Sequence, residues 1–160
     1  MRQATMIEPG KITYQDVPAP AVGPGEILLR VKRIGVCGTD VHVNHGRHPF
    51  TPYPVIQGHE FSAVVEAVGA GVTKVKPGDK ATARPQRVCG KCGPCRRGDY
   101  HICDSLKVEG FQAPGVARDL FVTVEERIVP LPASFTFEQG ALVEPVSVAV
   151  HSTLRARDLK

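Results

Sequence analysis

Four cysteines lie close together in one short, glycine-rich stretch of this 160-residue chain. They are Cys89, Cys92, Cys95 and Cys103, with the spacing C-x2-C-x2-C-x7-C. Glycine lets a backbone fold back on itself, so four sulfurs at this spacing can point at one centre and close a tetrahedral zinc site. An iron–sulfur cluster, which also uses cysteines at x2 spacing, is the alternative. A closed four-thiolate site has no open position, so the spacing predicts a structural metal rather than a catalytic one.

A second group of metal-ligand residues lies outside this cluster. The fifth cysteine, Cys37, stands in the segment GVCGTDVH, and His59 and Glu60 follow in the segment GHE. A thiolate, an imidazole and a carboxylate form the mixed ligand set of a catalytic zinc, in which three protein groups leave a place for water or substrate. Each residue alone predicts little, because a lone cysteine usually packs in a core and a His-Glu pair usually lies at the surface.

Length and composition exclude several classes of protein. A length of 160 residues suits one domain over residues 1–160. The net charge of +4 is spread along the chain without a dense basic block, which argues against nucleic-acid binding. No apolar run approaches the roughly 18 residues that span a bilayer, and the N-terminus lacks the pattern of a signal peptide, so we expect a cytoplasmic protein without a membrane partner. In a reducing compartment, clustered cysteines are expected to bind metal rather than to form disulfides.

The chain reads as a turn-rich, mainly β protein. It contains 16 glycines and 14 prolines, yet 42% of its residues are apolar, which favours many short strands over disorder. Strands are predicted at residues 4–7, 12–17, 26–34, 61–68, 80–84, 119–124 and 127–131. Only the last quarter is predicted to be helical, with one helix at 137–143 and a second that begins near Pro145 and runs to about Leu154.

Residues 69–74 (GAGVTK) are the only candidate for a glycine-rich nucleotide-binding loop. They lack a third glycine and continue into VTKVKPGDK, a strand and turn pattern rather than a helix. We therefore expect a tight turn between two strands here.

Five segments together resemble the medium-chain, zinc-dependent alcohol dehydrogenase family. They are GVCGTDVH at 35–42, GHE at 58–60, VGAGVTKVKPGDK at 68–80, CGKCGPCRRGDYHIC at 89–103 and LVEPVSVAVH at 142–151. The likeness is greatest to the polyol and sugar-acid dehydrogenases, sorbitol dehydrogenase included, and to threonine dehydrogenase. It implies the N-terminal, catalytic domain of such an enzyme: a GroES-like β-barrel with a structural zinc lobe at 89–103 and short C-terminal helices. The nicotinamide-binding Rossmann domain of the family is absent from this chain.

The resemblance also implies roles for individual residues. Cys37 and His59 would bind the catalytic zinc, and Glu60 would be either a direct ligand or one that exchanges with water. Glu144 would be the remaining ligand or would hold the zinc-bound water. Thr39 would lie beside the zinc-bound alcohol and pass its proton toward His42 and the coenzyme ribose. The alternative interpretation of His42 is a solvated histidine at the start of a short helix.

The implied cofactors are one catalytic zinc, one structural zinc and, in the full-length parent, NAD or NADP. The implied activity is hydride transfer from the secondary alcohol of a polyol, a sugar acid or a similar small molecule. The parent is expected to be a homo-oligomer, and this chain alone is expected to be inactive without a coenzyme domain. The alternatives are a non-enzymatic zinc-binding GroES-like module and a regulatory or assembly module derived from such an enzyme.

Overall fold

The computed structural model describes residues 1–157, which divide into two compact units. The first unit comprises Met1–Pro18, Val36–His59 and Pro85–Asp119. The second comprises Ala19–Gly35, Glu60–Arg84 and the chain from Leu120 onward. Each unit is therefore assembled from three separate stretches of sequence.

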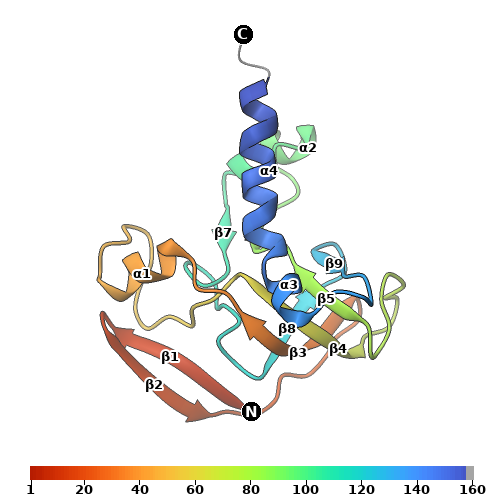
Figure 1. Cartoon of the computed structure of the whole chain (residues 1–160), viewed down its shortest axis with the longest axis horizontal. Coiled ribbons are helices and arrows are strands. Elements are labelled where there is room, and N and C mark those ends of the chain that lie inside the picture. The colour runs from red at the N-terminus through yellow and green to blue at the C-terminus, as the bar shows by residue number, and fades with distance from the viewer. Residues whose placement is uncertain (158–160) are drawn as a thin grey trace. The chain divides into compact units, whose positions relative to one another are not determined.

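A five-stranded antiparallel sheet forms the second unit (Figure 1). Its strand order is β8-β3-β4-β5-β9. The strands are β3 (Glu26–Ile34), β4 (Phe61–Val68), β5 (Lys80–Ala83), β8 (Leu120–Val124) and β9 (Ile128–Pro130). The long central strands β3 and β4 pair with each other, and two register shifts along β3 mark irregularities in this pairing.

Alternation of side chains along these strands produces the core of the second unit. Ile27 and Leu29 on β3 are fully buried. Val65 on β4 pairs with Leu29 and is buried as well. Phe61 on β4 meets Phe121 on β8 edge to face, with ring centroids 5.8 Å apart. A period of two along each strand places these apolar residues on one face of the sheet.

Two helices end the second unit: α3 (Phe137–Ala141) and α4 (Val143–Arg157). Thr136 caps α3, since its hydroxyl accepts from the Gln139 backbone N–H at 3.2 Å while the Gln139 side chain accepts from the Thr136 N–H at 2.9 Å. The Ser62 hydroxyl on β4 donates to the Phe137 carbonyl at 2.6 Å and joins this helix to the sheet. As expected, Pro145 lies in the first turn of α4, where its missing N–H has no helical partner to lose.

The first unit begins with a hairpin of β1 (Arg2–Glu8) and β2 (Lys11–Asp16). The short helix α1 (Gly38–Asn44) lies in the same unit. Met6 from β1, Val43 from α1, Val55 and Phe111 form its buried apolar cluster. Residues that are distant in sequence thus meet around α1, the helix that follows Cys37.

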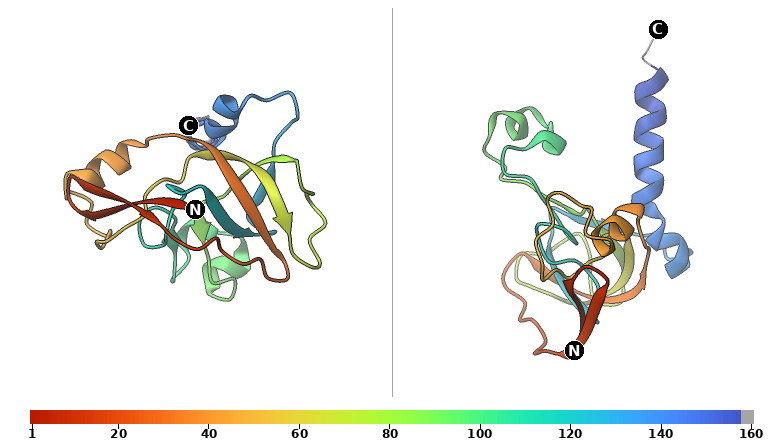
Figure 2. Two further views of the ribbon diagram at one scale, coloured as in Figure 1. Left: turned by 90° about the horizontal axis from the view of Figure 1, so that it is seen from below. Right: turned by 90° about the vertical axis from the view of Figure 1, so that its left-hand side faces the viewer.

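A two-stranded ribbon carries the cysteine-rich segment of the first unit (Figure 2). The ribbon pairs β6 (Gln86–Arg87) with β7 (Lys107–Val108). Between the two strands lie the helix α2 (Gly93–Arg97) and the 3-10 turn η1 (Tyr100–Ile102). The lobe is therefore an excursion of the chain that starts and ends at one narrow base.

The predicted mainly β fold is confirmed, and the predicted strands lie close to their observed positions. One prediction was wrong: helices are not confined to the last quarter of the chain, because α1 and α2 lie outside it. Both are short and begin directly after a cysteine of a predicted metal site, where glycine-rich composition conceals the helical period. The glycine-rich loop at 69–74 is a turn, as expected, in which Gly71 has a φ of 86°.

Candidate metal centres

The four clustered cysteines converge on one point. Four sulfur atoms lie within 4.8 Å of one another, those of Cys89, Cys92, Cys95 and Cys103. Cys92 caps the N-terminus of α2, Cys95 lies inside this helix, and Cys103 follows η1. The two short helical turns therefore bring together sulfurs that the extended chain would hold apart.

Two thiols of this cluster, those of Cys89 and Cys95, have different pKa values because their surroundings differ. Hydrogen bonds from the backbone N–H groups of Lys91 and Cys92 lower the pKa of the Cys89 thiol to about 6. Burial raises the pKa of the Cys95 thiol to about 12, and its sulfur neighbours add to this effect. The lobe thus presents at least one thiolate near neutral pH to an incoming cation, which is the form of cysteine that binds metal.

Cys37 and His59, two predicted ligands of the catalytic zinc, lie close together at the N-terminus of α1. Cys37 is the residue before this helix, and its sulfur lies within 4.8 Å of a ring nitrogen of His59. His59 is 5% exposed, and its ring lies 5.0 Å from the ring of Phe111. A buried imidazole beside a thiol is a suitable start for a mixed-ligand metal site.

Asp40, which sequence reasoning did not single out, binds the Cys37 backbone and lies beside His59. One of its carboxylate oxygens accepts from the Cys37 backbone N–H at 3.0 Å and lies 3.9 Å from His59 Nδ1. The Gln57 side-chain amide donates to the other carboxylate oxygen at 3.3 Å. Nδ1 is buried and, within residues 1–157, has no hydrogen-bond partner. A carboxylate beside the non-ligating nitrogen is the usual support of a metal-binding histidine, so this donor set fits a zinc ion.

Glu60 directly follows His59 and is the first residue of its stretch of the second unit. It is 8% exposed, and its backbone carbonyl accepts from the Gly35 N–H at 2.7 Å. A Cβ atom on Gly35 would lie 2.4 Å from a Glu60 carboxylate oxygen and 2.9 Å from the Glu60 Cβ. The glycine at position 35 therefore leaves the space that the Glu60 side chain occupies.

The remaining predicted site residues lie on helices. Thr39 belongs to α1, and its hydroxyl accepts from the Cys37 thiol at 3.6 Å. His42 lies in the last turn of α1 and is exposed, three residues beyond Thr39 and on the same side of the helix. Glu144 is half-buried in the first turn of α4, in the second unit. Its role at the metal stays a prediction.

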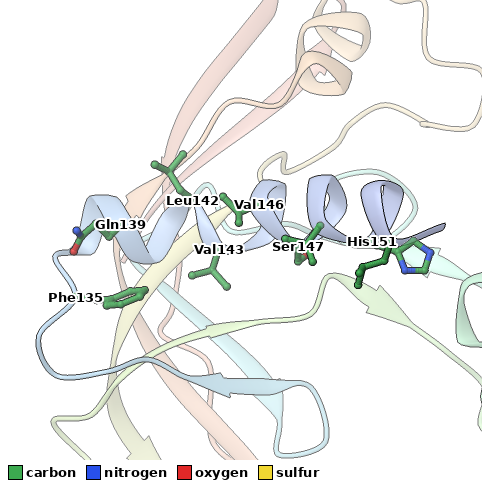
Figure 3. Close-up of a pocket in the computed structure, with 9 residues that line it drawn as sticks. Phe135, Gln139, Leu142, Val143, Val146, Ser147 and His151 are labelled. Carbon is green, nitrogen blue, oxygen red and sulfur yellow. The ribbon is translucent and has the colours of Figure 1, made fainter. Parts of the chain in front are cut away.

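An apolar groove of about 640 Å³ lies along α3 and α4 in the second unit (Figure 3). Its lining residues include Phe135, Leu142, Val146 and Leu154. Leu142, Val146 and Leu154 are each at least half exposed. The groove contains none of the predicted metal ligands, so it is not the candidate site.

Among the helices within residues 1–157, none has the length and hydrophobicity of a membrane span.

Residues 23–133 match the family model described as the alcohol dehydrogenase GroES-like domain. The chain is 36% identical to an L-threonine 3-dehydrogenase of Rhizobium etli, over 88% of this chain and 41% of that protein. It is 39% identical to a 2-dehydro-3-deoxy-L-galactonate 5-dehydrogenase of Pseudoalteromonas atlantica, over 92% of this chain and 44% of that protein.

Solved structures of dehydrogenases also resemble this chain. Galactitol-1-phosphate dehydrogenase of Escherichia coli superimposes with a TM-score of 0.91 at 27% identity, over 98% of this chain and 45% of that one. A dehydrogenase of Sinorhizobium meliloti, solved with bound NADP, gives a TM-score of 0.86 at 31% identity, over 95% of this chain and 44% of that one.

This chain belongs to the alcohol dehydrogenase GroES-like domain family. The predicted family and GroES-like fold are thereby confirmed. The chain spans less than half the length of the relatives it matches. Within residues 1–157, the only sheets are antiparallel, and no parallel Rossmann sheet is present.

Proposed function

We propose that this chain is the zinc-binding catalytic part of a nicotinamide-dependent dehydrogenase that oxidises a secondary alcohol of a polyol, a sugar acid or a similar small molecule. One observation carries the proposal: the Cys37 sulfur and a ring nitrogen of His59 lie within 4.8 Å of one another, and the Asp40 carboxylate lies beside both residues. The similarity to threonine and sugar-acid dehydrogenases supports the substrate class, and the NADP-bound structure supports the coenzyme.

In this proposal, two zinc ions have different residues and different tasks. Cys37, His59 and Glu60 bind the catalytic ion, with Glu144 as a further ligand or as the residue that holds its water. Because Asp40 faces His59 Nδ1, we assign the other ring nitrogen to the metal. The structural ion is held by all four clustered cysteines, over the lobe at residues 89–103. With four thiolates the lobe has no open position, so its role is to hold the loop.

A catalytic zinc supplies Lewis-acid chemistry that lowers the pKa of an alcohol hydroxyl from about 16 toward 7. The chain itself must then remove the proton. The Thr39 hydroxyl lies beside the Cys37 sulfur. In our proposal this hydroxyl accepts the proton of the alcohol. His42, on the same side of α1 and exposed, takes the proton from Thr39 and releases it to water. NAD or NADP, bound by a coenzyme domain, accepts the hydride.

Fusion of this chain to the coenzyme-binding part of the Rhizobium etli relative tests the proposed activity. The fusion protein should reduce NAD or NADP with at least one member of a panel of polyols, sugar acids and L-threonine. The same fusion with Cys37→Ser should keep the four-cysteine zinc and lose turnover. Equal activity of the two fusions would contradict the assignment of Cys37. A cytoplasmic location and a homo-oligomeric parent remain predictions.

A further inference from the structure

A fully buried carboxylate lies in the first unit, outside the proposed ligand sets. Glu109 is 0% exposed, and Arg87 Nε and Nη2 each lie 3.2 Å from its Oε1. Arg118 is the second cation of this cluster: burial lowers the pKa of its guanidinium, and the charge of Glu109 opposes that effect. A buried carboxylate is tolerated only where cations compensate for its lost hydration, so the three residues form one interdependent group.

This ion cluster stands at the base of the four-cysteine lobe. Arg87 ends β6 and Glu109 follows β7, the two strands between which the lobe is inserted. The Glu109 backbone N–H also donates to the Pro85 carbonyl at 3.1 Å. Arg87 is at the cysteine-side end of β6 and Glu109 follows the opposite end of the ribbon, so their ion pair crosses the ribbon, while the Glu109–Pro85 hydrogen bond closes its end away from the cysteines.

The segment after Glu109 packs against the backbone that precedes His59. A Cβ on Gly110 would lie 3.0 Å from the Gly58 nitrogen, and one on Gly115 would lie 2.3 Å from the Gly58 carbonyl oxygen. The Val116 N–H donates to that same oxygen at 3.0 Å. These are contacts of backbone with backbone, which leave no room for adjustment by side chains.

Arg118 joins the ion cluster to this close contact. Its Nε donates to the Gly115 carbonyl at 3.0 Å, while Glu109 itself directly precedes Gly110. The carboxylate and its second cation thus hold the two glycines that touch Gly58. A displacement of either glycine would be transmitted through Gly58 to the adjacent His59.

We propose that Glu109 is a positioning residue for the catalytic metal site: through Arg87 and Arg118 it fixes the segment 110–118, which fixes the Gly58–His59 backbone. The inference rests on the proposed role of His59 as a zinc ligand. It assigns to the ion cluster a function beyond stability, because misplacement of a ligand weakens metal binding even in a folded chain.

Cobalt binding to the 160-residue chain tests this proposal. Zinc is left in the four-cysteine lobe, and Co²⁺ is titrated into the Cys37–His59 site while its visible ligand-field absorption is recorded. Glu109→Gln keeps the shape of the side chain and removes its charge. We expect this variant to bind Co²⁺ roughly 10- to 100-fold more weakly, the usual effect of losing support behind a metal ligand, and to shift the absorption bands.

Glu66→Gln is the matched control. Glu66 forms a charged pair with Arg30 at 2.6 Å in the second unit, but this pair is partly exposed, so its loss should leave cobalt affinity and absorption unchanged. Arg87→Gln is the second variant, used because the half-exposed Arg87 can be replaced even if Glu109→Gln fails to fold. It should weaken cobalt binding in the same direction.

The possible outcomes separate the two proposals. Wild-type affinity and band positions in a folded Glu109→Gln chain would overturn the positioning role, as would wild-type values in Arg87→Gln if the first variant does not fold. A lower melting temperature with an unchanged cobalt spectrum and affinity would show a purely stabilising role and would overturn it too. If the unmodified chain binds no more Co²⁺ than Cys37→Ser, the proposed metal site itself is wrong.

Discussion

At Gly35, the absence of one methyl group leaves room for the Glu60 carboxylate. Gly35→Ala would place a carbon atom 2.4 Å from the Glu60 Oε2 and 2.9 Å from its Cβ, so Glu60 would have to move as a whole. We expect this change to weaken metal binding at the Cys37–His59 site by roughly tenfold, measured by competition with a chelator.

Gly38→Ala is the control for that change in the same motif. Gly38 starts α1, and an added Cβ there would meet no atom within 4 Å. Alanine also favours helix over glycine, so metal affinity should be unchanged and stability equal or slightly higher. Equal effects of the two alanine substitutions would contradict the steric argument at Gly35.

A second prediction at the scale of single residues concerns thiol reactivity in the metal-free chain. Because the pKa of Cys89 is lowered from 9 to about 6, its thiolate contributes stability that is fully present above pH 9 and is lost as the pH falls from 9 through about 6. Cys95 has its pKa raised from 9 to about 12, so it stays a neutral thiol at neutral pH, and its contribution is present below pH 9 and lost as the pH rises from 9 to about 12. At pH 7 iodoacetamide should therefore modify Cys89 first and Cys95 last, as peptide mass spectrometry would show. The reverse order would refute the assigned environments.

Among the elements, the four-cysteine lobe depends most on its metal. Its helix α2 spans only Gly93–Arg97, far too short to be stable alone, and its ribbon has two residues per strand. Structural zinc contributes on the order of 10 kcal/mol of apparent binding energy to such a segment. Cys92→Ser should therefore unfold the lobe locally and lower the melting temperature.

Hydrogen exchange of the amides at residues 93–103 and zinc content would measure this effect. Cys37→Ser is the comparison variant, because it removes a thiolate from the other site and should leave protection in the lobe intact. A Cys92→Ser chain with full metal content and an unchanged melting temperature would show that the four sulfurs do not close a metal site.

The elements also show where prediction from sequence works. β3 and β4 are observed at Glu26–Ile34 and Phe61–Val68, the predicted ranges, since each buries apolar residues with a period of two. The strand predicted at 127–131 is observed as β9 (Ile128–Pro130); its last residue, Pro130, pairs with Ala81 at a sheet edge, where a missing N–H costs no ladder bond. A short helix near His42 was only an alternative interpretation, and α1 places His42 in its last turn rather than at its start; only Val43 and Asp40 are buried in α1, too few for a helical pattern to be visible.

At the scale of the whole molecule, the two proposed metal sites should differ in affinity. The lobe offers four sulfurs that are already gathered, whereas the other site has one sulfur, one imidazole and oxygen ligands. Mild chelation of the zinc-loaded chain should leave about one zinc ion bound, as measured by elemental analysis. Parallel loss of both ions would argue against two sites of different kinds.

Coenzyme binding is the second prediction at this scale. Hydride transfer needs the nicotinamide carbon roughly 3–3.5 Å from the reacting carbon, and a coenzyme domain normally supplies that placement. Within residues 1–157, the one glycine-rich candidate, residues 69–74, is a turn after β4. Isothermal titration of the 160-residue chain with NAD and NADP should therefore show no micromolar binding, unlike the fusion protein. Micromolar binding by the short chain would require a nucleotide site elsewhere in it.

The sequence by itself predicted the strands other than β6 and β7, the turn at 69–74 and the two groups of candidate metal ligands, because period, turn chemistry and cysteine spacing are local properties. Only the tertiary structure showed that Asp40 and Gln57 support His59 and that Gly35 makes room for Glu60. It alone showed that Glu109 is fully buried and that the neighbouring Gly110 lies against Gly58. These relations join residues that are far apart in the chain, and the physical reason is that burial and close backbone contact exist only once the chain has folded.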